Sequence, residues 1–358
     1  MKILQLGYMS IRQCINKYGD TTALEALNPG VDEFYLFSYR TVEGQRAKLA
    51  NVRIHEFKYS PPVFHQLKVF FYLLAFAIRK KPDIIHAKDQ EIIGPFAFLI
   101  SRLTGVPYCI SLHGGERPPN LIGRFVLKRA DMVLPISRYL ARYAESHGVS
   151  PDRIRVAYHG VDPLRFQNKP EYDSGGRRRV AFVGRLSPEK RVYEMLLVMF
   201  AICRQRSDVT FLIAGDGKER RTMEQLVKAH DYTDRILFLG FQTRWAVAEL
   251  MQSSDVILCP YSGFVLIEAA MSGKPIVAND AEWHGELIEH EKNGLLLPFD
   301  SIDRPAAAII RLLNDEKLSR RLGQTARGKA FKEFAVAVTD KTKIKYYYEL
   351  INRGRKEV

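Results

Sequence analysis

Short apolar runs alternate with longer helical patterns along the first half of the chain. Strand-like runs are predicted at residues 3–6, 34–37, 52–57, 84–86, 108–112, 132–136 and 154–157. Helical patterns are predicted between them, at residues 63–80, 91–103, 121–129 and 137–147. Short, mostly apolar strands separated by helices are typical of a parallel sheet that is covered by helices on both faces. The first half therefore predicts a doubly wound α/β domain.

The second half repeats this alternation after a polar break. The break covers residues 166–179 and contains a Pro, a Gly-Gly pair and a run of arginines, without a hydrophobic period. Strands are predicted after it at residues 180–183, 209–214, 236–239, 256–259, 276–278 and 295–297. Helices are predicted at residues 189–206, 218–230, 244–252, 266–271, 282–290, 304–314, 316–334 and 339–352. The pattern predicts two Rossmann-like domains, at residues 1–166 and 180–335, with a linker at residues 167–179 and a cleft between the domains.

One stretch of the second half, residues 256–285, is predicted to form a complete βαβ unit. A buried strand ends before Pro260, a turn with Gly263 leads into a short apolar helix, and a second strand ends near Asn279. In open parallel sheets, ligands bind outside the carboxyl ends of the strands. The residues that follow these two strands, at 260–263 and 279–285, are therefore predicted to lie at a ligand site.

The chain is strongly basic, with 54 Lys and Arg against 40 Asp and Glu and a formal charge of +14. This balance favours an anionic partner such as nucleic acid, an anionic lipid surface or a phosphorylated small molecule. A solvated basic surface is the alternative. Aromatic residues do not interleave with the basic ones and no reader motif is present, so nucleic acid is not expected as a partner.

The cysteines and the apolar runs bear on the location of the protein. The 4 cysteines are far apart and lack metal-binding spacing, which favours a reduced, cytoplasmic compartment and no metal. The apolar run at the start is too short for a signal peptide. Residues 67–78 are the most apolar stretch, but a membrane-spanning helix needs about 20 residues. We expect a buried helix there, with contact to a membrane surface as the alternative.

The segment after the predicted strand at residues 180–183 has the features of an anion site. Gly184 permits a tight turn, and Pro188 suits the first turn of a helix. Arg185 and Lys190 would stand at the carboxyl end of the strand, where two cations suit a diphosphate. The alternative is that both are surface cations of a basic protein.

Three other strand ends carry residues that can contact a ligand. Gly215 begins a Gly-Asp-Gly turn whose backbone can approach a nucleotide, although this sequence is also a common turn. His113 ends a strand just before two glycines and can hydrogen-bond a substrate or move a proton, with a structural histidine as the alternative. Glu286 is an acid near the exit of the strand at residues 276–278.

Glu268 stands on an otherwise apolar helix start. A carboxylate there is costly unless a partner pairs with it. A ribose diol is one candidate partner, because it offers two hydroxyl donors. The alternative is an acid at a helix N-terminus, where the helix dipole favours negative charge.

Taken in order, these segments resemble the family 4 retaining glycosyltransferases, which have the GT-B fold. The resemblance covers nearly the whole second half and parts of the first. A close match is Val183-Gly-Arg-Leu-Ser-Pro-Glu-Lys190. Further matching segments are Ala130-Asp-Met-Val-Leu-Pro-Ile-Ser137, Tyr158-His-Gly-Val-Asp162, Ala214-Gly-Asp-Gly217, Phe238-Leu-Gly240 and Glu268-Ala-Ala-Met-Ser-Gly-Lys-Pro-Ile-Val277. Each segment is weakly specific, but the ordered set is strongly specific.

The resemblance implies roles for the residues of the second half. Arg185 and Lys190, beside Gly184 and Gly215, would hold the donor diphosphate and stabilise the charge that develops as it leaves, without a metal. Glu268 would bind the ribose of the nucleotide. The second domain would therefore bind the nucleotide sugar.

The resemblance also implies roles for the first domain. His113 would contact the donor sugar or its phosphate, and the first domain would bind the acceptor. Closure of the two domains would bring donor and acceptor together. Residues 336–358 would form a helix that crosses back to the first domain.

One position departs from the family pattern. Family members carry two glutamates eight positions apart; Glu268 matches the second, but Pro260 stands at the position of the first. The first glutamate normally contacts the donor sugar, so the resemblance does not fix the donor. Gly263 keeps the glycine register, and the amides of Gly263 and Phe264 are candidates for contacts with sugar hydroxyls. Candidates for a replacement acid are Asp280, Glu282 and Glu286.

Residues and resemblance together predict a retaining glycosyltransferase that needs no cofactor. It would move a sugar from a nucleoside diphosphate sugar, such as a UDP-sugar, to a hydroxyl of a glycan, lipid-linked or small-molecule acceptor in polysaccharide or glycolipid assembly. The expected location is the cytoplasm, with the inner face of the membrane as an alternative. Candidate contacts to anionic lipid are Arg117, Arg124, Lys128 and Arg129.

Pro260 motivates two rival functions. The first is a non-catalytic homologue that binds a nucleotide sugar or acts as an assembly partner. The second is a nucleotide-sugar epimerase with the same fold.

Overall fold

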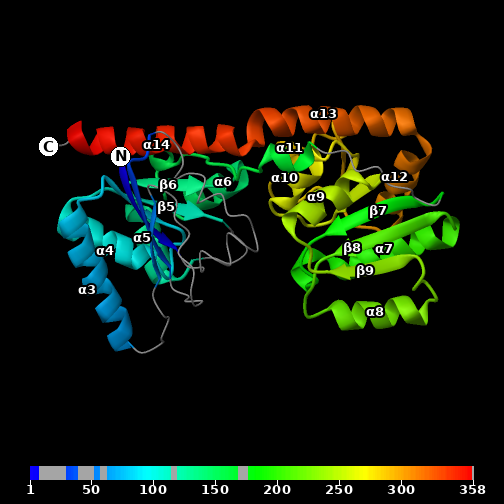
Figure 1. The fold of residues 1–358 in the computed structure, drawn as a ribbon, viewed down its shortest axis with the longest axis horizontal. Coiled ribbons are helices and arrows are strands. Elements are labelled where there is room, and N and C mark those ends of the chain that lie inside the picture. Colours follow the sequence, from blue (N-terminus) through cyan, green and yellow to red (C-terminus); the bar gives the residue numbers. More distant parts are fainter. Residues whose placement is uncertain (8–29, 39–51, 57–62, 114–118, 168–175, 357–358) are drawn as a thin grey trace. The chain divides into compact units, whose positions relative to one another are not determined.

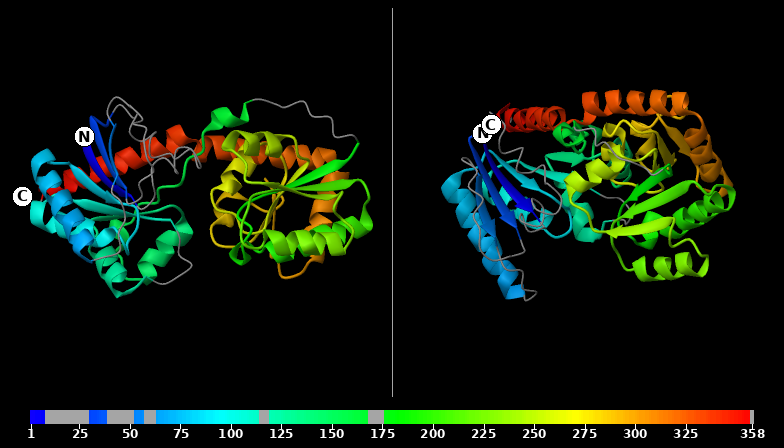
Figure 2. Two further views of the ribbon diagram at one scale, coloured as in Figure 1. Left: turned by 60° about the horizontal axis from the view of Figure 1, so that its bottom comes forward. Right: turned by 45° about the vertical axis from the view of Figure 1, so that its right-hand side comes forward.

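A computed structural model describes residues 1–7, 30–38, 52–56, 63–113, 119–167 and 176–356 (Figure 1). The chain divides into two compact units. The first unit consists of Met1–Gly160 and Val336–Val358, and the second unit is Val161–Ala335. The views in Figure 2 show helices on both faces of the sheet in each unit. The predicted α/β class with two doubly wound domains is confirmed.

The first unit is built on a six-stranded parallel sheet with the order β3-β2-β1-β4-β5-β6. Its strands are β1 (Lys2–Gly7), β2 (Glu33–Ser38), β3 (Val52–Glu56), β4 (Ile84–Ala87), β5 (Tyr108–Leu112) and β6 (Met132–Pro135). Its helices are α3 (Val63–Lys80), α4 (Gly94–Thr104), α5 (Leu121–Arg129), α6 (Arg138–Ser146) and α14 (Val336–Lys356), with a 3-10 turn η2 (Pro151–Arg153). Helices α3, α4 and α5 contribute to the core on one face of the sheet, and α14 packs on the other face (Figure 1).

The strand predicted at residues 154–157 is wrong. The segment runs beside β6, where the amide of Arg155 donates to the carbonyl of Val133 at 3.0 Å and that of Ala157 donates to Pro135 at 2.8 Å. A parallel ladder also needs an N–H from β6 to the carbonyl of Arg155, and Pro135 has none. Only an isolated bridge between Val133 and Ile154 therefore forms.

The expectation that the apolar stretch at residues 67–78 forms a fully buried helix is wrong in part. The stretch lies on α3, and Val69, Leu73 and Ala77 face the core with at most 3% exposure. Phe71 and Ile78 on the other side of the same helix are 61% and 59% exposed. The helix is therefore apolar on both its buried and its exposed faces.

The second unit has its own six-stranded parallel sheet, with the order β12-β11-β10-β7-β8-β9. Its strands are β7 (Arg178–Val183), β8 (Val209–Ala214), β9 (Ile236–Gly240), β10 (Val256–Cys259), β11 (Ile276–Asn279) and β12 (Leu295–Leu297). Its helices are α7 (Val192–Gln205), α8 (Arg220–Ala229), α9 (Arg244–Gln252), α10 (Val265–Met271), α11 (His284–Leu287), α12 (Asp303–Asn314) and α13 (Glu316–Phe334), with 3-10 turns η3 (Pro163–Phe166) and η4 (Pro188–Lys190). Strand β7 pairs with β8 on one side and with β10 on the other. From β7 the chain builds the sheet outward through β8 and β9, and then from β10 outward in the opposite direction, so the strand order reverses between β7 and β10.

Two helices of the second unit are shorter than predicted. The pattern at residues 189–206 begins as η4, and Arg191, with a φ of 54°, separates this turn from α7. The pattern at residues 282–290 yields only α11, because Glu282 has a φ of 47° before the helix and Ile288 is extended after it. Residues in the left-handed region interrupt helical hydrogen bonding.

The boundaries of the units differ from the predicted domains at both ends of the predicted linker. Arg178 and Arg179 at its end already form the start of β7. The first unit ends at Gly160, and Val161–Phe166 belong to the second unit, where Val161 pairs with Ala335 and Phe166 is fully buried. Most of the predicted linker, residues 168–175, lies outside the described residues. Residues 336–358 belong to the first unit, where Tyr347 hydrogen-bonds the buried His86 at 2.8 Å.

Candidate functional site

The loops after β7 and β8 interlock at the carboxyl edge of the second unit's sheet. The amide of Gly184 donates to the carbonyl of Ala214 at 3.0 Å, and that of Leu186 donates to Asp216 at 3.0 Å. Gly215 has a φ of +148°, and a Cβ there would lie 1.8 Å from the carbonyl oxygen of Gly184. Only glycine fits this crossing, so the two glycine turns form one rigid backbone surface.

Arg185 and Lys190 stand on the loop that follows β7. Arg185 is 70% exposed, and its Nη1 lies 3.4 Å from Oε1 of Glu189. An exposed pair of this kind stabilises a protein by about 0–1 kcal/mol, so moving Arg185 to an anionic ligand costs little. Lys190 is half-buried, and its Nζ lies 5.1 Å from the centre of the Tyr261 ring on the neighbouring loop.

The β10–α10 loop, Pro260 to Phe264, reaches the same edge of the sheet. Gly263 is exposed, and an added Cβ would meet no atom within 4 Å. Phe264 is half-buried beneath the guanidinium of Arg244, 4.8 Å from the ring centre. The adjacent Ser262 is buried and hydrogen-bonded to His284 of α11. The loop therefore offers open space at Gly263 beside an anchored backbone.

Glu268 of α10 is buried, with 3% exposure, and is paired with two arginines. Its Oε1 lies 2.8 Å from Nη1 of Arg165 on η3 and 3.4 Å from Nη1 of Arg244 on α9. Burial raises the pKa of Glu268, while the charges of Arg165 and Arg244 act in the opposite direction. The partner that a buried carboxylate needs is thus present within the protein.

Glu286 lies on the short α11 after β11. Its side chain is half-buried, and its backbone carbonyl accepts a hydrogen bond from Lys329 at 3.0 Å. Of the other acids considered near this strand exit, Asp280 is exposed and Glu282 is half-buried. All three are therefore at the edge of the sheet without being fixed in its core.

His113 belongs to the first unit, where it follows β5. Its Nδ1 lies 3.2 Å from Nε2 of His159, and the two rings are stacked with an angle of 20° between them. Shielding by the surrounding chain lowers the pKa of His113 well below its usual value, and the nearby His159 and Lys88 lower it further. His113 as a whole residue is nevertheless exposed. The residues at 114–118, Arg117 among them, lie outside the described residues.

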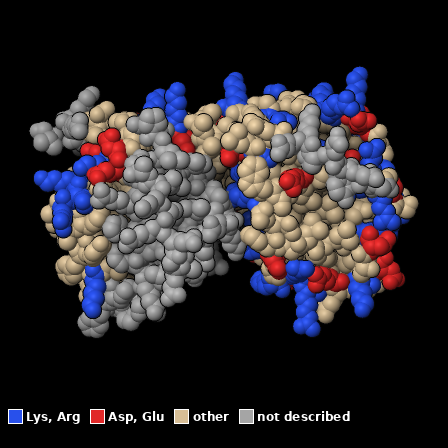
Figure 3. Space-filling model, in the orientation of Figure 1, with Lys and Arg blue, Asp and Glu red and all other residues tan. Residues whose placement is uncertain are grey.

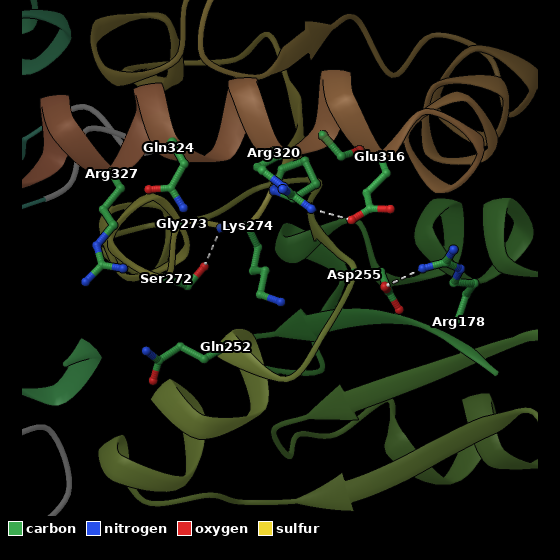
Figure 4. Close-up of a pocket in the computed structure, with 12 residues that line it drawn as sticks. Arg178, Gln252, Asp255, Ser272, Gly273, Lys274, Glu316, Arg320, Gln324 and Arg327 are labelled. Atoms are coloured by element: carbon green, nitrogen blue, oxygen red, sulfur yellow. Dashed lines mark hydrogen bonds and ion pairs between the residues drawn. The ribbon is translucent and has the colours of Figure 1, made fainter. Parts of the chain in front are cut away.

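A cavity of about 430 Å³ lies at the opposite, amino-terminal edge of the second unit's sheet (Figure 4). Arg178 at the start of β7 pairs with Asp255 at 3.2 Å, and Arg320 of α13 pairs with Glu316 at 2.6 Å. The side chain of Lys274, from the turn after α10, lies between those of Gln252 and Asp255 in this view (Figure 4). Figure 3 shows Lys and Arg side chains gathered over α13. None of the predicted site residues lines this cavity.

Sequence reasoning missed four residues of the site at the carboxyl edge. They are Arg165, Arg244, Tyr261 and His284. Arg165 and Arg244 lie 103 and 24 residues from Glu268 in the chain. The buried acid indicated that a partner was needed, but no spacing along the chain identifies which cation meets it.

Two family descriptions together match residues 27–329. The family of glycosyl transferases group 1 matches residues 165–329, and glycosyltransferase family 4 matches residues 27–165. The chain is 30% identical over 315 residues to N-acetyl-alpha-D-glucosaminyl L-malate synthase of Bacillus anthracis, covering 79% of this chain and 80% of the relative. It is 25% identical over 270 residues to alpha-D-kanosaminyltransferase of Streptomyces kanamyceticus, covering 67% and 70%.

Solved structures share the fold across the whole chain. Anabaena HepE in complex with UDP has a TM-score of 0.80 at 20% identity, covering 98% of this chain and 100% of that one. Sucrose-phosphate synthase of Thermosynechococcus elongatus has a TM-score of 0.80 at 19% identity, covering 98% and 99%. At these identities the likeness concerns the fold alone.

Proposed function

This chain belongs to the family 4 glycosyltransferases of the GT-B fold, and from that premise we propose that it moves a sugar, with retention of configuration, from a nucleoside diphosphate sugar to a hydroxyl acceptor. The observation that carries the proposal is the meeting of three loops at one edge of the second unit's sheet. The loops after β7, β8 and β10 follow neighbouring strands, at the point where the sheet order reverses. Ligands of open α/β sheets bind at such points.

Arg185 and Lys190 are proposed to hold the diphosphate of the donor. Both stand on the loop after β7, beside the interlocked turns at Gly184 and Gly215. In the reaction, negative charge accumulates on the leaving diphosphate, and fixed cations lower the free energy of that state. Two cations supply this stabilisation directly, so the proposed reaction proceeds without a metal or another cofactor.

Glu268 is proposed to bind the ribose of the donor. Both arginines contact its Oε1, and Oε2 has no hydrogen-bond partner among the described residues. The two positive charges favour the carboxylate form, whose oxygens only accept hydrogen bonds. A ribose diol supplies the matching donors. Arg165 and Arg244 would thus orient the acid that binds the ribose.

UDP-sugars are the first donors to test. HepE of Anabaena has been crystallised with UDP, with UDP and glucose, and with UDP-glucose. Because Pro260 replaces the acid that usually contacts the donor sugar, the identity of that sugar is left to the experiment. The acceptor is proposed to be a glycan, a lipid-linked sugar or a small molecule. His113, with its partner His159, is proposed to contact the donor sugar or its phosphate.

Incubation with UDP-glucose, UDP-N-acetylglucosamine and GDP-mannose tests the proposed activity. Acceptor-dependent release of the nucleoside diphosphate is the expected result. Conversion of the sugar without release would instead indicate an epimerase. Binding without either reaction would indicate a non-catalytic homologue, the alternative that Pro260 raises.

The double variant Arg185→Ala with Lys190→Ala tests the diphosphate assignment. We expect turnover to fall at least about 10³-fold, because two groups that stabilise the leaving charge are removed. The fold should remain, since Arg185 is 70% exposed and its pair with Glu189 is weak. Turnover within tenfold of the wild type would remove the assignment.

A matched control is Arg304→Ala with Lys317→Ala. Arg304 forms an i,i+4 pair with Asp300 at 3.3 Å, much like the pair of Arg185 with Glu189 at 3.4 Å, and Lys317 is exposed on α13. The control removes the same charge from the same unit but away from the site. It should turn over at the wild-type rate.

We further propose that the first unit contacts an anionic membrane surface through an apolar patch on α4 and α5. The α4–α5 patch consists of Leu99, Leu103, Leu121, Ile122 and Phe125, with exposures of 45%, 62%, 87%, 60% and 44%. Exposed basic residues on the same two helices are Arg102, Arg124, Lys128 and Arg129. Exposed apolar side chains and cations on the same helices suit the interface of an anionic bilayer. Among the described residues, every helix is too short or too polar to cross a bilayer.

Flotation with vesicles of phosphatidylserine and phosphatidylcholine tests this contact. Replacing Arg124, Lys128 and Arg129 by alanine should reduce binding by about two orders of magnitude, because each cation near an anionic surface contributes about 1 kcal/mol. A control with Lys317, Arg320 and Arg321 replaced by alanine removes equal charge from α13 and should bind as the wild type. Equal binding by all three proteins would exclude the patch as the contact.

A further inference from the structure

His284 of α11 is almost fully buried, with 1% exposure, and connects the exits of two neighbouring strands. Its Nδ1 lies 2.7 Å from the carbonyl oxygen of Asn279, the last residue of β11. Its Nε2 lies 3.1 Å from the amide nitrogen of Ser262, in the β10–α10 loop. The same Nε2 is 2.8 Å from the carbonyl oxygen of Ser262. One ring thus joins β11 to the loop that follows β10.

The chemistry of these partners determines how the ring binds. A carbonyl oxygen only accepts, so Nδ1 must carry the hydrogen that binds Asn279. In the neutral ring, Nε2 then carries no hydrogen and accepts the amide hydrogen of Ser262. The contact of Nε2 with the Ser262 carbonyl is a hydrogen bond only when both ring nitrogens carry hydrogen. Burial is the main cause of a lowered pKa for His284. The hydrogen bonds with the backbones of Ser262 and Asn279 and the charge of Glu282 act in the opposite direction, and the charge of Lys190 lowers the pKa further. The ring is therefore neutral at neutral pH.

The anchored loop is where this chain departs from its family. Pro260 occupies the place of the acid that normally contacts the donor sugar, and Gly263 beside it opens to solvent. His284 contacts the peptide group on each side of Ser262, through its amide and through its carbonyl, and the second of these peptide groups joins Ser262 to Gly263. Tyr261 on the other side contacts Lys190, one of the cations assigned to the diphosphate.

We propose that His284 is a positioning residue that holds the Tyr261–Phe264 main chain in the orientation that receives the donor sugar. This inference rests on the proposed function. The glutamate that usually contacts the donor sugar is replaced by Pro260, and in this chain the main chain of the hydrogen-bonded loop would orient the sugar instead. A histidine that served only the stability of the fold would affect unfolding without affecting the sugar part of the donor.

Three substitutions of His284 separate a role in orienting the donor from a role in fold stability alone. His284→Ala removes both hydrogen bonds. His284→Gln keeps an acceptor at about the distance of Nε2, so it can still bind the Ser262 amide. His284→Asn reaches only as far as Nδ1, so it keeps the bond to Asn279 and loses the one to Ser262. The thermal midpoint of each variant shows whether the fold is intact.

The rate of amide hydrogen exchange at residues 259–266 measures how firmly the β10–α10 loop is held. We expect faster exchange in His284→Ala and His284→Asn than in the wild type, and near wild-type exchange in His284→Gln. Protection of this segment in His284→Ala equal to that in the wild type would overturn the proposal, because the loop would then be held without His284.

The affinity for the nucleotide sugar shows whether the held loop contributes to donor binding. For each nucleotide sugar of the panel above, the dissociation constant is compared with that of its nucleoside diphosphate alone. In His284→Ala the nucleotide sugar should bind about tenfold more weakly, the loss expected for one displaced buried hydrogen bond, while the nucleoside diphosphate should bind within about twofold of the wild type. His284→Gln should restore the sugar contribution and His284→Asn should not.

The outcomes distinguish this inference from the proposed function. Equal weakening of nucleotide sugar and nucleoside diphosphate, or equal rescue by Gln and Asn, would show a structural role alone and overturn it. Failure of the wild type to bind any nucleotide of the panel would overturn the proposed function and the donor-orienting role together. The exchange measurement would then still report on the anchor.

Discussion

The stacked pair of His113 and His159 is the residue-scale feature with the clearest dependence on pH. The nitrogens of the two rings are 3.2 Å apart, so one must donate and the other must accept. That arrangement needs at least one neutral ring. A second histidine thus stands beside the residue proposed to contact the donor.

Activity is expected to be lost at acid pH. The pKa of His113 is lowered below its usual value of 6.5, so the ring is neutral at neutral pH and gains a proton only as the pH falls well below that value. Because His159 contributes to this lowering, His159→Asn should raise the pKa of His113 and move the loss of activity to higher pH. Profiles of kcat/KM for the donor against pH measure this shift.

Exposed His290 provides the control for this prediction. His290→Asn should leave the acid side of the profile unchanged. A profile of His159→Asn that coincides with the wild type, or that moves toward lower pH, would show that the histidine pair does not set the acid limit.

At the scale of elements, the crossing of the loops after β7 and β8 is the most constrained part of the site. The backbone of Gly215 passes so close to Gly184 that no side chain fits between them. Because the contact is between two main chains, no flexible side chain can move aside to relieve a clash. The positions of Arg185 and Lys190 depend on this crossing, because both residues follow Gly184 on the same loop.

Gly215→Ala should therefore weaken both the fold and the donor site. A Cβ at 1.8 Å from the Gly184 oxygen and a φ of +148° both oppose alanine. We expect a loss of about 1–3 kcal/mol in the free energy of unfolding, with weaker nucleotide binding. Chemical denaturation and titration calorimetry measure the two effects.

Gly263→Ala is the matched control for stability. It is also a site glycine at the end of a strand, but an added Cβ there meets nothing within 4 Å. Its free energy of unfolding should stay within about 0.5 kcal/mol of the wild type. Equal destabilisation by the two substitutions would contradict the crossing as the cause.

Most elements could be predicted from the sequence, since their apolar runs are short and well separated. The bounds of α5, β5, β8, β10 and α13 match the predicted residues. The prediction at residues 154–157 failed because the partner strand, through Pro135, lacks the N–H that a ladder needs. A run of apolar residues shows that a segment suits a strand, but pairing depends on the neighbour that it meets.

At the scale of the whole molecule, α14 completes the first unit from the end of the chain. Ile344, Tyr347 and Leu350 of α14 join the core on one face of that unit's sheet. The hydroxyl of Tyr347 is 2.8 Å from Nδ1 of His86, whose Nε2 is 2.7 Å from the Ser111 hydroxyl. Residues near the C-terminus are thus part of the core formed by the first strands.

Tyr347→Ala should destabilise the first unit while leaving the second unit intact. Tyr347 is fully buried, so its loss leaves a cavity and removes a hydrogen bond from His86. Removal of a large buried aromatic side chain costs about 3–5 kcal/mol. Differential scanning calorimetry should show one unfolding transition at lower temperature, with a transition of the second unit unchanged.

The neighbouring Tyr348 provides the control. It is 43% exposed, and its hydroxyl donates to the Gly30 carbonyl at 3.1 Å. Tyr348→Ala should cost about 1 kcal/mol or less. Similar losses for both tyrosines, or a lowered transition of the second unit after Tyr347→Ala, would contradict the assignment of α14 to the first unit.

Local patterns along the chain were enough to identify the fold class and the family of this protein. Apolar periodicity is a local property, and it is enough to identify two doubly wound domains. The ordered motifs, from Ala130-Asp to Glu268, were enough to indicate the glycosyltransferase family, and the family matches bear this out. The departure at Pro260 was also visible, because it is a matter of residue identity at one position.

The surroundings of each of these residues depend on how the elements pack in the folded protein. His284 reaches the Ser262 amide across 22 residues, and Gly215 crosses Gly184, because paired parallel strands bring their carboxyl ends together whatever their order in the chain. Arg165 of η3 reaches Glu268 across 103 residues, and α14 joins the first unit, through the packing of helical elements within each unit. Contacts of this kind depend on the packing of whole elements, which no spacing along the chain records.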